Sequence, residues 1–193
     1  MGILDLFRKT EKDEVQGARV LACAIDNRFD SLLKTDSEIY GRYYRATTTE
    51  VIPSINALVR RLRQKFDIVH LMADVTERGT ICDSTGQETT GTELIQYCCD
   101  HDVKLLWVAS DNPPGNYIKG FVARGKNLNL VMTFKRKGPN FPGFLQELLS
   151  RMAYGESMPV AWNDICPQIP GSKHKDSPES IFYAGRGGVR LLA

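Results

Sequence analysis

Two apolar runs in the middle of the chain end in polar residues that could take part in chemistry. The first run, residues 66–74, ends at Asp74, and the second, residues 103–111, ends at Ser110 and Asp111. Short apolar runs followed by turn residues are typical of buried strands in a parallel sheet. Ligands and reacting groups in open α/β sheets lie beyond the carboxyl ends of such strands, so these side chains are the first candidates for a functional site.

The residue types at these strand ends suggest chemistry based on a hydroxyl or on carboxylates. A serine hydroxyl needs a base beside it, and Asp74 is too weak a base for a hydroxyl of ordinary acidity. Carboxylates gathered after neighbouring strands can hold Mg²⁺ for phosphoryl-transfer or nuclease chemistry. The acids that follow the first, third and fourth predicted strands are Asp26, Asp74, Glu77 and Asp111, although no P-loop or GxGxxG pattern accompanies them.

Strands and helices are predicted to alternate along the chain from residue 18. The sequence predicts strands over 18–25, 40–48, 67–73, 103–109, 128–134 and 181–185, and a hairpin over 79–91. It predicts helices that start after Thr49 and at Thr92, and further helices near 117–124, 141–154 and 159–162. Such alternation indicates an α/β fold with a mainly parallel central sheet flanked by helices on both faces. Residues 18–193 are expected to form one domain, and residues 1–17 a partly flexible N-terminal segment.

The composition is that of a globular protein. Of the 193 residues, 42% are hydrophobic and 25% are charged, which distinguishes the chain from a disordered one. The formal net charge of +2 gives no broad electrostatic case for nucleic-acid binding. The local basic run Lys135-Arg136-Lys137 is expected to be a solvated loop. The sequence shows neither a signal peptide nor an apolar run long enough to cross a bilayer.

The cysteines and histidines do not form a recognisable metal site. Five cysteines, an odd number without a CxxC pair, favour reduced thiols in the cytoplasm over a disulfide framework. The three histidines have no ligand-like spacing to them, so zinc is not expected. No other cofactor is predicted.

Three stretches of the sequence have counterparts in a known family. Residues 70–75 read HLMADV, residues 107–110 read WVAS, and residues 182–185 read FYAG. In their order, with a hairpin and a helix between the first two, they resemble the caspase-like peptidases, and within them the bacterial CHAT group. In that family the first stretch reads roughly His-Leu-Ala-x-His-Gly, and its second His is the catalytic base. The second stretch reads Leu-Ser-Ala-Cys and supplies the nucleophile.

The resemblance places Asp74 at the position of the catalytic His and Ser110 at the position of the catalytic Cys. A Cys–His dyad works because the imidazole stabilises the thiolate that attacks the substrate, and neither replacement can do this. His70 lies four residues before Asp74, roughly 13 Å away along a strand, and is expected to be a core residue. The resemblance therefore implies a caspase-like fold over about residues 18–192 with a degenerate catalytic site.

The function predicted on this basis is protein–protein interaction. A pseudo-peptidase of this kind would act as a scaffold or regulatory subunit in the cytoplasm, and its cleft could still bind an extended peptide. The residues expected to line the cleft are Asp26, Asp74, Glu77, Ser110 and Asp111. A second candidate contact is the apolar cluster formed by Ile3, Leu4, Leu6 and Phe7.

Three alternatives remain open at this point. An active cysteine peptidase would use another thiol, for which Cys82 and Cys166 are the candidates, the latter with His174 eight residues on. A Mg²⁺-dependent phosphoryl-transfer or nuclease domain would use the acids at the strand ends. A nucleotide or small-ligand sensor would use the loops 112–115 and 185–190, whose backbone N–H groups and arginines could bind an anion. The sequence names neither the partner nor the oligomeric state.

Overall fold

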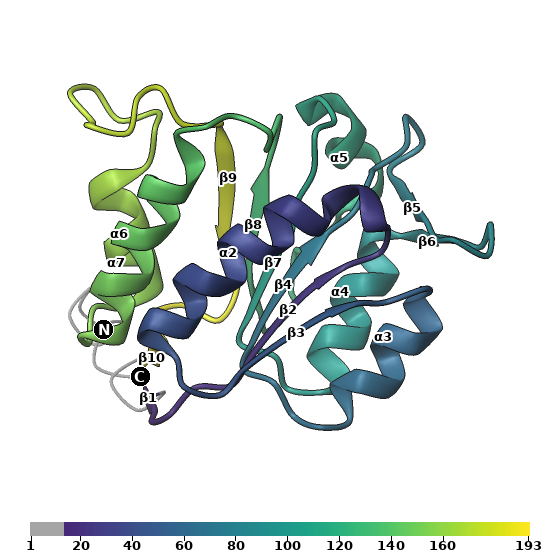
Figure 1. Cartoon of the computed structure of the whole chain (residues 1–193), viewed down its shortest axis with the longest axis horizontal. Helices are drawn as coiled ribbons and strands as arrows, with labels where there is room; N and C mark the ends of the chain where they lie inside the picture. Colours follow the sequence, from purple (N-terminus) through teal and green to yellow (C-terminus); the bar gives the residue numbers. More distant parts are fainter. Residues whose placement is uncertain (1–13) are drawn as a thin grey trace, which may run out of the picture.

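A six-stranded sheet runs through the middle of the molecule in the computed structural model, which describes residues 14–193 (Figure 1). The strands stand in the order β3-β2-β4-β7-β8-β9, and all neighbours are parallel except β8 and β9. Their bounds are β2 Val20–Ala24, β3 Thr47–Val51, β4 Ile68–Met72, β7 Leu105–Ala109, β8 Asn129–Thr133 and β9 Ser180–Ala184. The predicted α/β fold with a mainly parallel central sheet is therefore confirmed.

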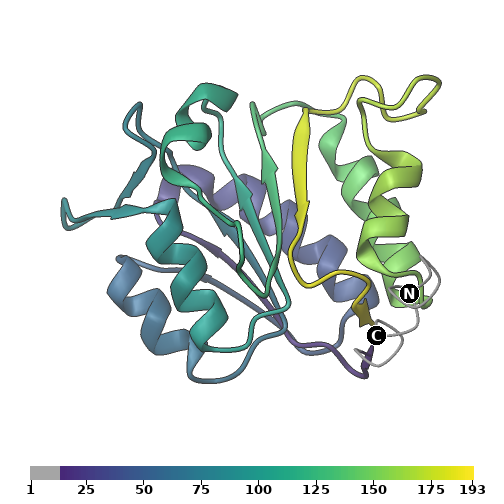
Figure 2. The same ribbon diagram turned by 180° about the vertical axis from the view of Figure 1, so that it is seen from behind.

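Helices cover both faces of the sheet, as predicted. One face carries α2 (Asp30–Tyr43), α6 (Phe141–Ala153) and α7 (Met158–Ile165), and the other carries α3 (Ile55–Leu62), α4 (Gly91–Asp100) and α5 (Pro114–Gly120) (Figures 1 and 2). Each face has its own hydrophobic cluster, to which alternate residues of the strands contribute. The four central strands β2, β4, β7 and β8 are buried along their whole length, which explains why they read as continuous apolar runs.

Five small elements complete the described part of the chain. The strands β5 (Thr80–Cys82) and β6 (Glu88–Thr90) form the antiparallel hairpin that the turn-rich sequence over 79–91 predicts. The strand β1 (Glu14–Val15) pairs in parallel with β10 (Arg190–Leu191), and the 3₁₀ turn η1 (Asn27–Phe29) follows β2. Among residues 14–193, no helix has the length and apolar composition needed to cross a membrane.

The second sheet strand was predicted in the wrong place. The sequence predicts a strand over 40–48, but α2 runs to Tyr43 and β3 begins only at Thr47. The inner face of α2 includes the carboxyl side chain of Asp36. A charged residue at a core position interrupts the apolar pattern by which a helix is recognised.

The helix predicted to start after Thr49 also begins later. Residues up to Val51 continue β3, and α3 starts after Ser54, whose hydroxyl accepts a hydrogen bond from the Ala57 N–H at 3.2 Å. This is the usual way in which a serine caps the N-terminus of a helix. The apolar cluster predicted near the N-terminus, residues 3–7, lies outside the described residues. Of the predicted segment 1–17, Glu14 and Val15 form β1.

Candidate binding site at the carboxyl edge of the sheet

The predicted site residues follow three neighbouring strands at one edge of the sheet. The chain leaves β2 toward β3 on one side and returns to β4 on the other, so the strand order reverses between β2 and β4. Such a reversal leaves a crevice beyond the carboxyl ends of the two strands. Asp26 follows β2, Asp74 and Glu77 follow β4, and Ser110 and Asp111 follow β7. The structure therefore brings all five to the carboxyl edge.

Arg28 joins the acids that follow β2 and β4. Its Nε lies 2.9 Å from Asp26 Oδ2, and its Nη2 lies 2.8 Å from Asp74 Oδ2. Asp26 also accepts a hydrogen bond from the Arg28 backbone N–H at 2.8 Å. That bond and the guanidinium hold the pKa of Asp26 below its usual value. Sequence reasoning missed Arg28, because only the turn of η1 brings it back over the strand end.

A second ion pair involves the acid that follows β7. Lys137, in the loop after β8, places its Nζ 2.8 Å from Asp111 Oδ2, and its backbone N–H donates to Asp111 Oδ1 at 2.9 Å. Asp111 raises the pKa of Lys137, and Asp74 contributes to the same shift. Charges of alternating sign thus run along the carboxyl edge in the order Asp26, Arg28, Asp74, Lys137 and Asp111. We call these five residues the charge row.

Ser110 lies beneath the charge row and not on the surface. Its side chain is completely buried. Its hydroxyl oxygen accepts hydrogen bonds from the Tyr117 hydroxyl at 2.6 Å and from the Asn112 backbone N–H at 3.0 Å. Its own backbone extends the β7–β8 ladder, since the Ser110 N–H donates to the Thr133 carbonyl at 3.1 Å. Ser110 is therefore a structural residue below the predicted cleft and does not line it.

The loops that carry Asp74 and Ser110 are bonded directly to each other. The backbone N–H of Val75 donates to Asn112 Oδ1 at 2.6 Å, and Asn116 Nδ2 donates to the Val75 carbonyl at 2.7 Å. These bonds satisfy both backbone polar groups of Val75, a buried residue, and hold the two strand ends in a fixed relation. No local pattern in the sequence indicates this pairing, since Asn112 lies in the loop after β7 and Asn116 lies in α5.

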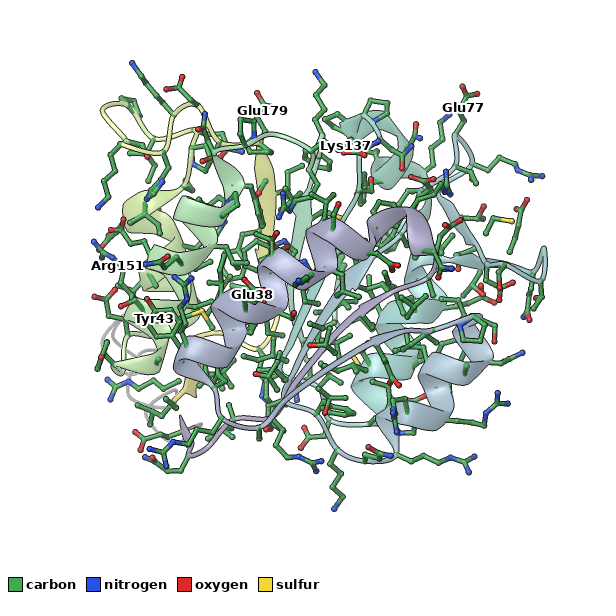
Figure 3. All side chains as sticks on the ribbon, in the orientation of Figure 1. Glu38, Tyr43, Glu77, Lys137, Arg151 and Glu179 are labelled. Atoms are coloured by element: carbon green, nitrogen blue, oxygen red, sulfur yellow. The ribbon has the colours of Figure 1, made fainter. Side chains whose placement is uncertain are left out.

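Glu77 stands apart from the charge row, nearer the hairpin. Its side chain is exposed, and its backbone carbonyl accepts a hydrogen bond from Lys119 Nζ at 2.9 Å. Figure 3 shows Glu77 and Lys137 at the same end of the molecule. The base of the hairpin packs against α5 where Gly79 (φ 77°) meets Gly120, and a Cβ on either glycine would overlap the backbone of the other. Both positions therefore require glycine.

A buried polar cluster lies under α2, between this helix and the middle of β4. His70 is fully buried, as expected of a core residue, and its Nδ1 lies 3.1 Å from the Tyr40 hydroxyl. Its Nε2 lies 3.5 Å from Asp36 Oδ2, and its ring stacks on Trp107 at 5.4 Å between centroids. Asp36 also forms an ion pair with Arg136. His70 is thus held in the core, away from Ser110.

Arg136 corrects the prediction that the basic run 135–137 is a solvated loop. Lys135 and Lys137 are exposed, but the Arg136 side chain is only 1% exposed. Its guanidinium carbon lies 3.9 Å from the centre of the Phe141 ring, and its Nε lies 3.4 Å from Asp36 Oδ2. Its backbone N–H donates to the Ser110 carbonyl at 2.9 Å. Arg136 thus connects α2, through Asp36, to the end of β7, where it bonds to Ser110.

The thiols proposed as alternative nucleophiles are not paired with histidines. Cys82 is exposed on the hairpin, and its sulfur donates to the Asp83 carbonyl at 3.8 Å. Cys166 is buried, and burial raises the pKa of its thiol, which disfavours the reactive thiolate. His174, which follows Cys166 in sequence, is bonded instead to Glu147, with 2.8 Å between Nε2 and Oε2. Among the contacts of the described residues, neither thiol has a catalytic base.

The acids of the charge row do not form a metal-ligand set. Asp26 and Asp74 both face the guanidinium of Arg28, and Asp111 faces Lys137. Cations at these distances compete with a metal ion for the carboxylate oxygens. Within residues 14–193, no group of three or more His, Cys, Asp or Glu side chains is placed to hold a metal.

The two loops of the ligand-sensor alternative lie at opposite edges of the sheet. Residues 112–115 follow β7 at the carboxyl edge. Residues 185–190 follow β9, which is antiparallel, so they lie at the amino edge, beside the start of β8. There Arg186 Nη1 lies 2.9 Å from Asp102 Oδ1. The two loops therefore cannot bind one small ligand between them.

The burial of Ser110 predicts that a thiol at this position would be unreactive. In a Ser110→Cys variant we expect iodoacetamide to leave residue 110 unmodified in the folded protein and to modify it in urea, because Tyr117 covers the site. Exposed Cys82 is the internal control and should react in both conditions. Peptide mass spectrometry measures both. Rapid modification of residue 110 in the folded state would show that the site is open.

Comparison with protein-family models finds no match for this chain, and comparison with curated proteins finds no similar sequence.

Proposed function

We propose that this protein is a catalytically degenerate, caspase-like domain of the CHAT type that binds a protein partner at its carboxyl edge. The order of its elements supports the proposal, since β4 is followed by a hairpin, a helix and then β7, as in the family that the sequence resembles. Its free cysteines support a reducing compartment such as the cytoplasm. The fold alone does not define a function, so the proposal depends on the site.

The observation that carries the proposal is the state of the two residues at the family's catalytic positions. Ser110 is buried and accepts hydrogen bonds from Tyr117 and Asn112. Asp74 is ion-paired with Arg28. A nucleophile has to reach its substrate and needs a base within hydrogen-bond distance. Ser110 is covered, and among the contacts of residues 14–193 its hydroxyl has no base. The carboxyl edge is therefore better suited to binding than to peptide hydrolysis.

The surface above these residues has the features of a protein-binding site. The charge row is exposed at Arg28 and Lys137, where the side chains are 67% and 74% accessible. Beside it, α5 and the residues after it expose two apolar side chains, Ile118 (74%) and Val122 (54%). An alternating row of charges discriminates between partners through electrostatic complementarity, and adjacent apolar side chains contribute buried area.

Site-specific crosslinking tests the proposal. A photoreactive phenylalanine analogue at Glu77 is expected to crosslink one discrete protein when the full chain is expressed at its native level. The same analogue at Glu38 is the matched control, because both glutamates are exposed but Glu38 lies on α2, away from the carboxyl edge (Figure 3). Asp74→Arg should reduce the crosslinked species at least about tenfold, since it places like charges beside Arg28.

Two outcomes would count against the proposal. The first is equal crosslinking from Glu38 and Glu77, or crosslinking from Glu77 that Asp74→Arg does not change. The second is saturable labelling of the wild-type chain by a thiol-reactive peptide probe that a single Cys→Ala change abolishes. That result would show an active cysteine peptidase with a nucleophile other than residue 110.

A further inference from the structure

The strand β3 has an open outer side. It stands at the end of the sheet and, within the described residues, pairs with β2 alone. The Val20 N–H donates to the Ala46 carbonyl at 2.9 Å, and the Ile52 N–H donates to the Ala24 carbonyl at 2.7 Å. In a parallel ladder, alternate residues bond to the same neighbour, so the even-numbered residues of β3 face β2. The N–H and C=O groups of Thr47, Thr49 and Val51 therefore face outward.

This edge lacks the features that usually prevent strand addition. Natural edge strands are protected by prolines, charged side chains, bulges or a covering segment. The one charged residue of β3, Glu50, is neutralised by Arg61. The pairing of β3 with β2 continues without a bulge over five residues, from Thr47 to Val51. None of the three outward-facing residues is charged or proline, and Thr49 and Val51 are exposed. The backbone groups of this edge are free to accept another strand.

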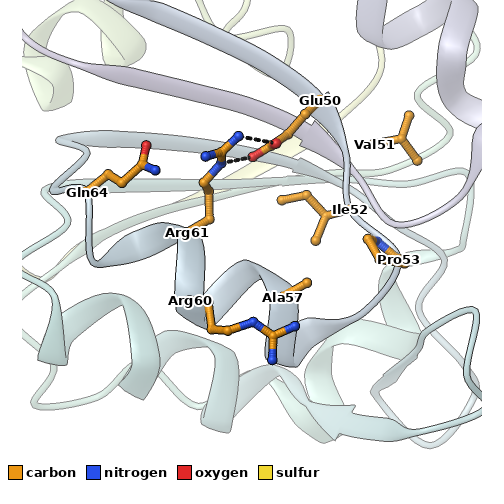
Figure 4. Close-up of a pocket in the computed structure, with 8 residues that line it drawn as sticks. All are labelled: Glu50, Val51, Ile52, Pro53, Ala57, Arg60, Arg61 and Gln64. Atoms are coloured by element: carbon orange, nitrogen blue, oxygen red, sulfur yellow. Dashed lines mark hydrogen bonds and ion pairs between the residues drawn. The ribbon is translucent and has the colours of Figure 1, made fainter.

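A positively charged groove lies beside the same edge. It has a volume of about 350 Å³, and the residues that line it include Glu50, Val51, Arg60 and Arg61 (Figure 4). Arg61 binds both carboxylate oxygens of Glu50, with 2.6 Å between Nη2 and Oε2. The only acid in the groove is therefore neutralised. Arg60 has no ion-pair partner among residues 14–193, which leaves the groove positive.

We propose that the outer edge of β3 and this groove bind an extended acidic segment of a protein partner by strand addition. The backbone of the segment pairs with Thr47, Thr49 and Val51. Every second side chain of an added strand faces α3, and a carboxylate there meets Arg60. The main-chain bonds provide affinity and Arg60 provides the preference for acidic side chains. This surface is separate from the charge row, so it remains available when the carboxyl edge is occupied.

Peptide binding tests the charge preference. A fluorescein-labelled Val-Glu-Val-Glu-Val-Glu peptide should bind the full chain saturably in a fluorescence anisotropy titration. The corresponding Val-Lys peptide should bind at least about tenfold more weakly, because a charge-assisted hydrogen bond is replaced by repulsion. Arg60→Glu should weaken binding of the acidic peptide by a similar factor. Arg124→Glu, an exposed arginine outside the groove, is the control and should bind as the wild type does.

Backbone blocking tests strand addition itself. Thr49→Pro removes an outward-facing N–H without removing a bond to β2, and it should abolish binding, whereas Thr49→Val should not. Circular dichroism checks that both variants are folded. The peptide provides an independent test, since N-methylation of one alternate set of its residues should abolish binding and methylation of the other set should not.

Three results would overturn the inference. One is absence of binding by the acidic peptide at millimolar concentration, and another is equal binding of the two N-methylated peptides. The third is a change from dimer to monomer on Thr49→Pro in sedimentation, because the occupant of the edge would then be a second copy of the chain. None of these results bears on crosslinking at Glu77, so the two proposals fail separately.

Discussion

Asp36→Ala is expected to lower the free energy of unfolding by about 3–5 kcal/mol at pH 7.5. Asp36 and Arg136 are both almost completely inaccessible and form an ion pair under α2. Removing the carboxylate leaves the guanidinium buried beside Phe141 without a counter-charge. Burial of an unpaired charge is costly because the low-dielectric interior does not replace its hydration. Urea denaturation followed by circular dichroism measures the change.

Two further variants show whether the effect comes from the unpaired charge. Asp164→Ala breaks an exposed ion pair with Arg151 and should change stability by less than about 1 kcal/mol. The double variant Asp36→Leu with Arg136→Met removes both buried charges and should recover most of the loss. A loss of less than about 1 kcal/mol in Asp36→Ala would show that the pair is hydrated.

His70→Gln is expected to become more stable relative to the wild type as the pH falls from 7 to 4. Burial lowers the pKa of His70 from 6.5 to about 3. The unfolded chain therefore binds a proton below about pH 6.5 that the folded chain does not. The contribution of neutral His70 to stability is complete above the unfolded pKa and is lost as the pH falls toward 3. The difference is at most about 1.4 kcal/mol per pH unit.

Asp36 has the opposite dependence on pH. Burial raises the pKa of its carboxyl from 3.8 to about 6, against the opposing effect of Arg136. The part of its contribution that depends on proton binding is therefore present below pH 3.8 and is lost as the pH rises through about 6, whereas its ion pair with Arg136 remains at pH 7.5. As the pH falls from about 6 to 4, the wild type loses stability through His70 and gains stability through Asp36, and the two changes offset each other. In His70→Gln only the gain through Asp36 remains.

Urea denaturation at pH 7.5, 6.0, 5.0 and 4.5 measures this difference. Glutamine keeps a hydrogen-bonding group near Tyr40 but does not titrate. His101→Gln is the control, since His101 lies at the end of α4, outside the buried cluster, and this substitution leaves His70 and Asp36 in place. Parallel pH curves for wild type and His70→Gln would show that His70 is not held neutral by burial.

The sequence predicted the central strands well because these strands are buried on both sides. Continuous apolar runs identified β2, β4, β7 and β8, and the polar residues behind them correctly marked one edge of the sheet. The direction of β9 was not predictable in this way. Parallel and antiparallel strands of five residues have the same apolar pattern, and only the two helices before β9 determine its direction.

The interactions within the site were harder to predict because they join residues far apart in the chain. Nothing local indicates that Arg28 binds Asp74 or that Asp36 binds Arg136 across 100 positions. The burial of Ser110 has the same origin, since Tyr117 covers it from α5. Residue types and strand ends located the edge, whereas the pairing of charges depended on tertiary packing.

The loop after β8 has a consequence for how this protein can change during evolution. Lys135 turns the chain with a left-handed backbone (φ 50°), after which Arg136 points into the core and Lys137 pairs with Asp111 at the surface. Mutations that reshape the interior under α2 will therefore also move a residue of the charge row. Changes in the surface charges of this edge and repacking of the core are genetically linked through three consecutive codons.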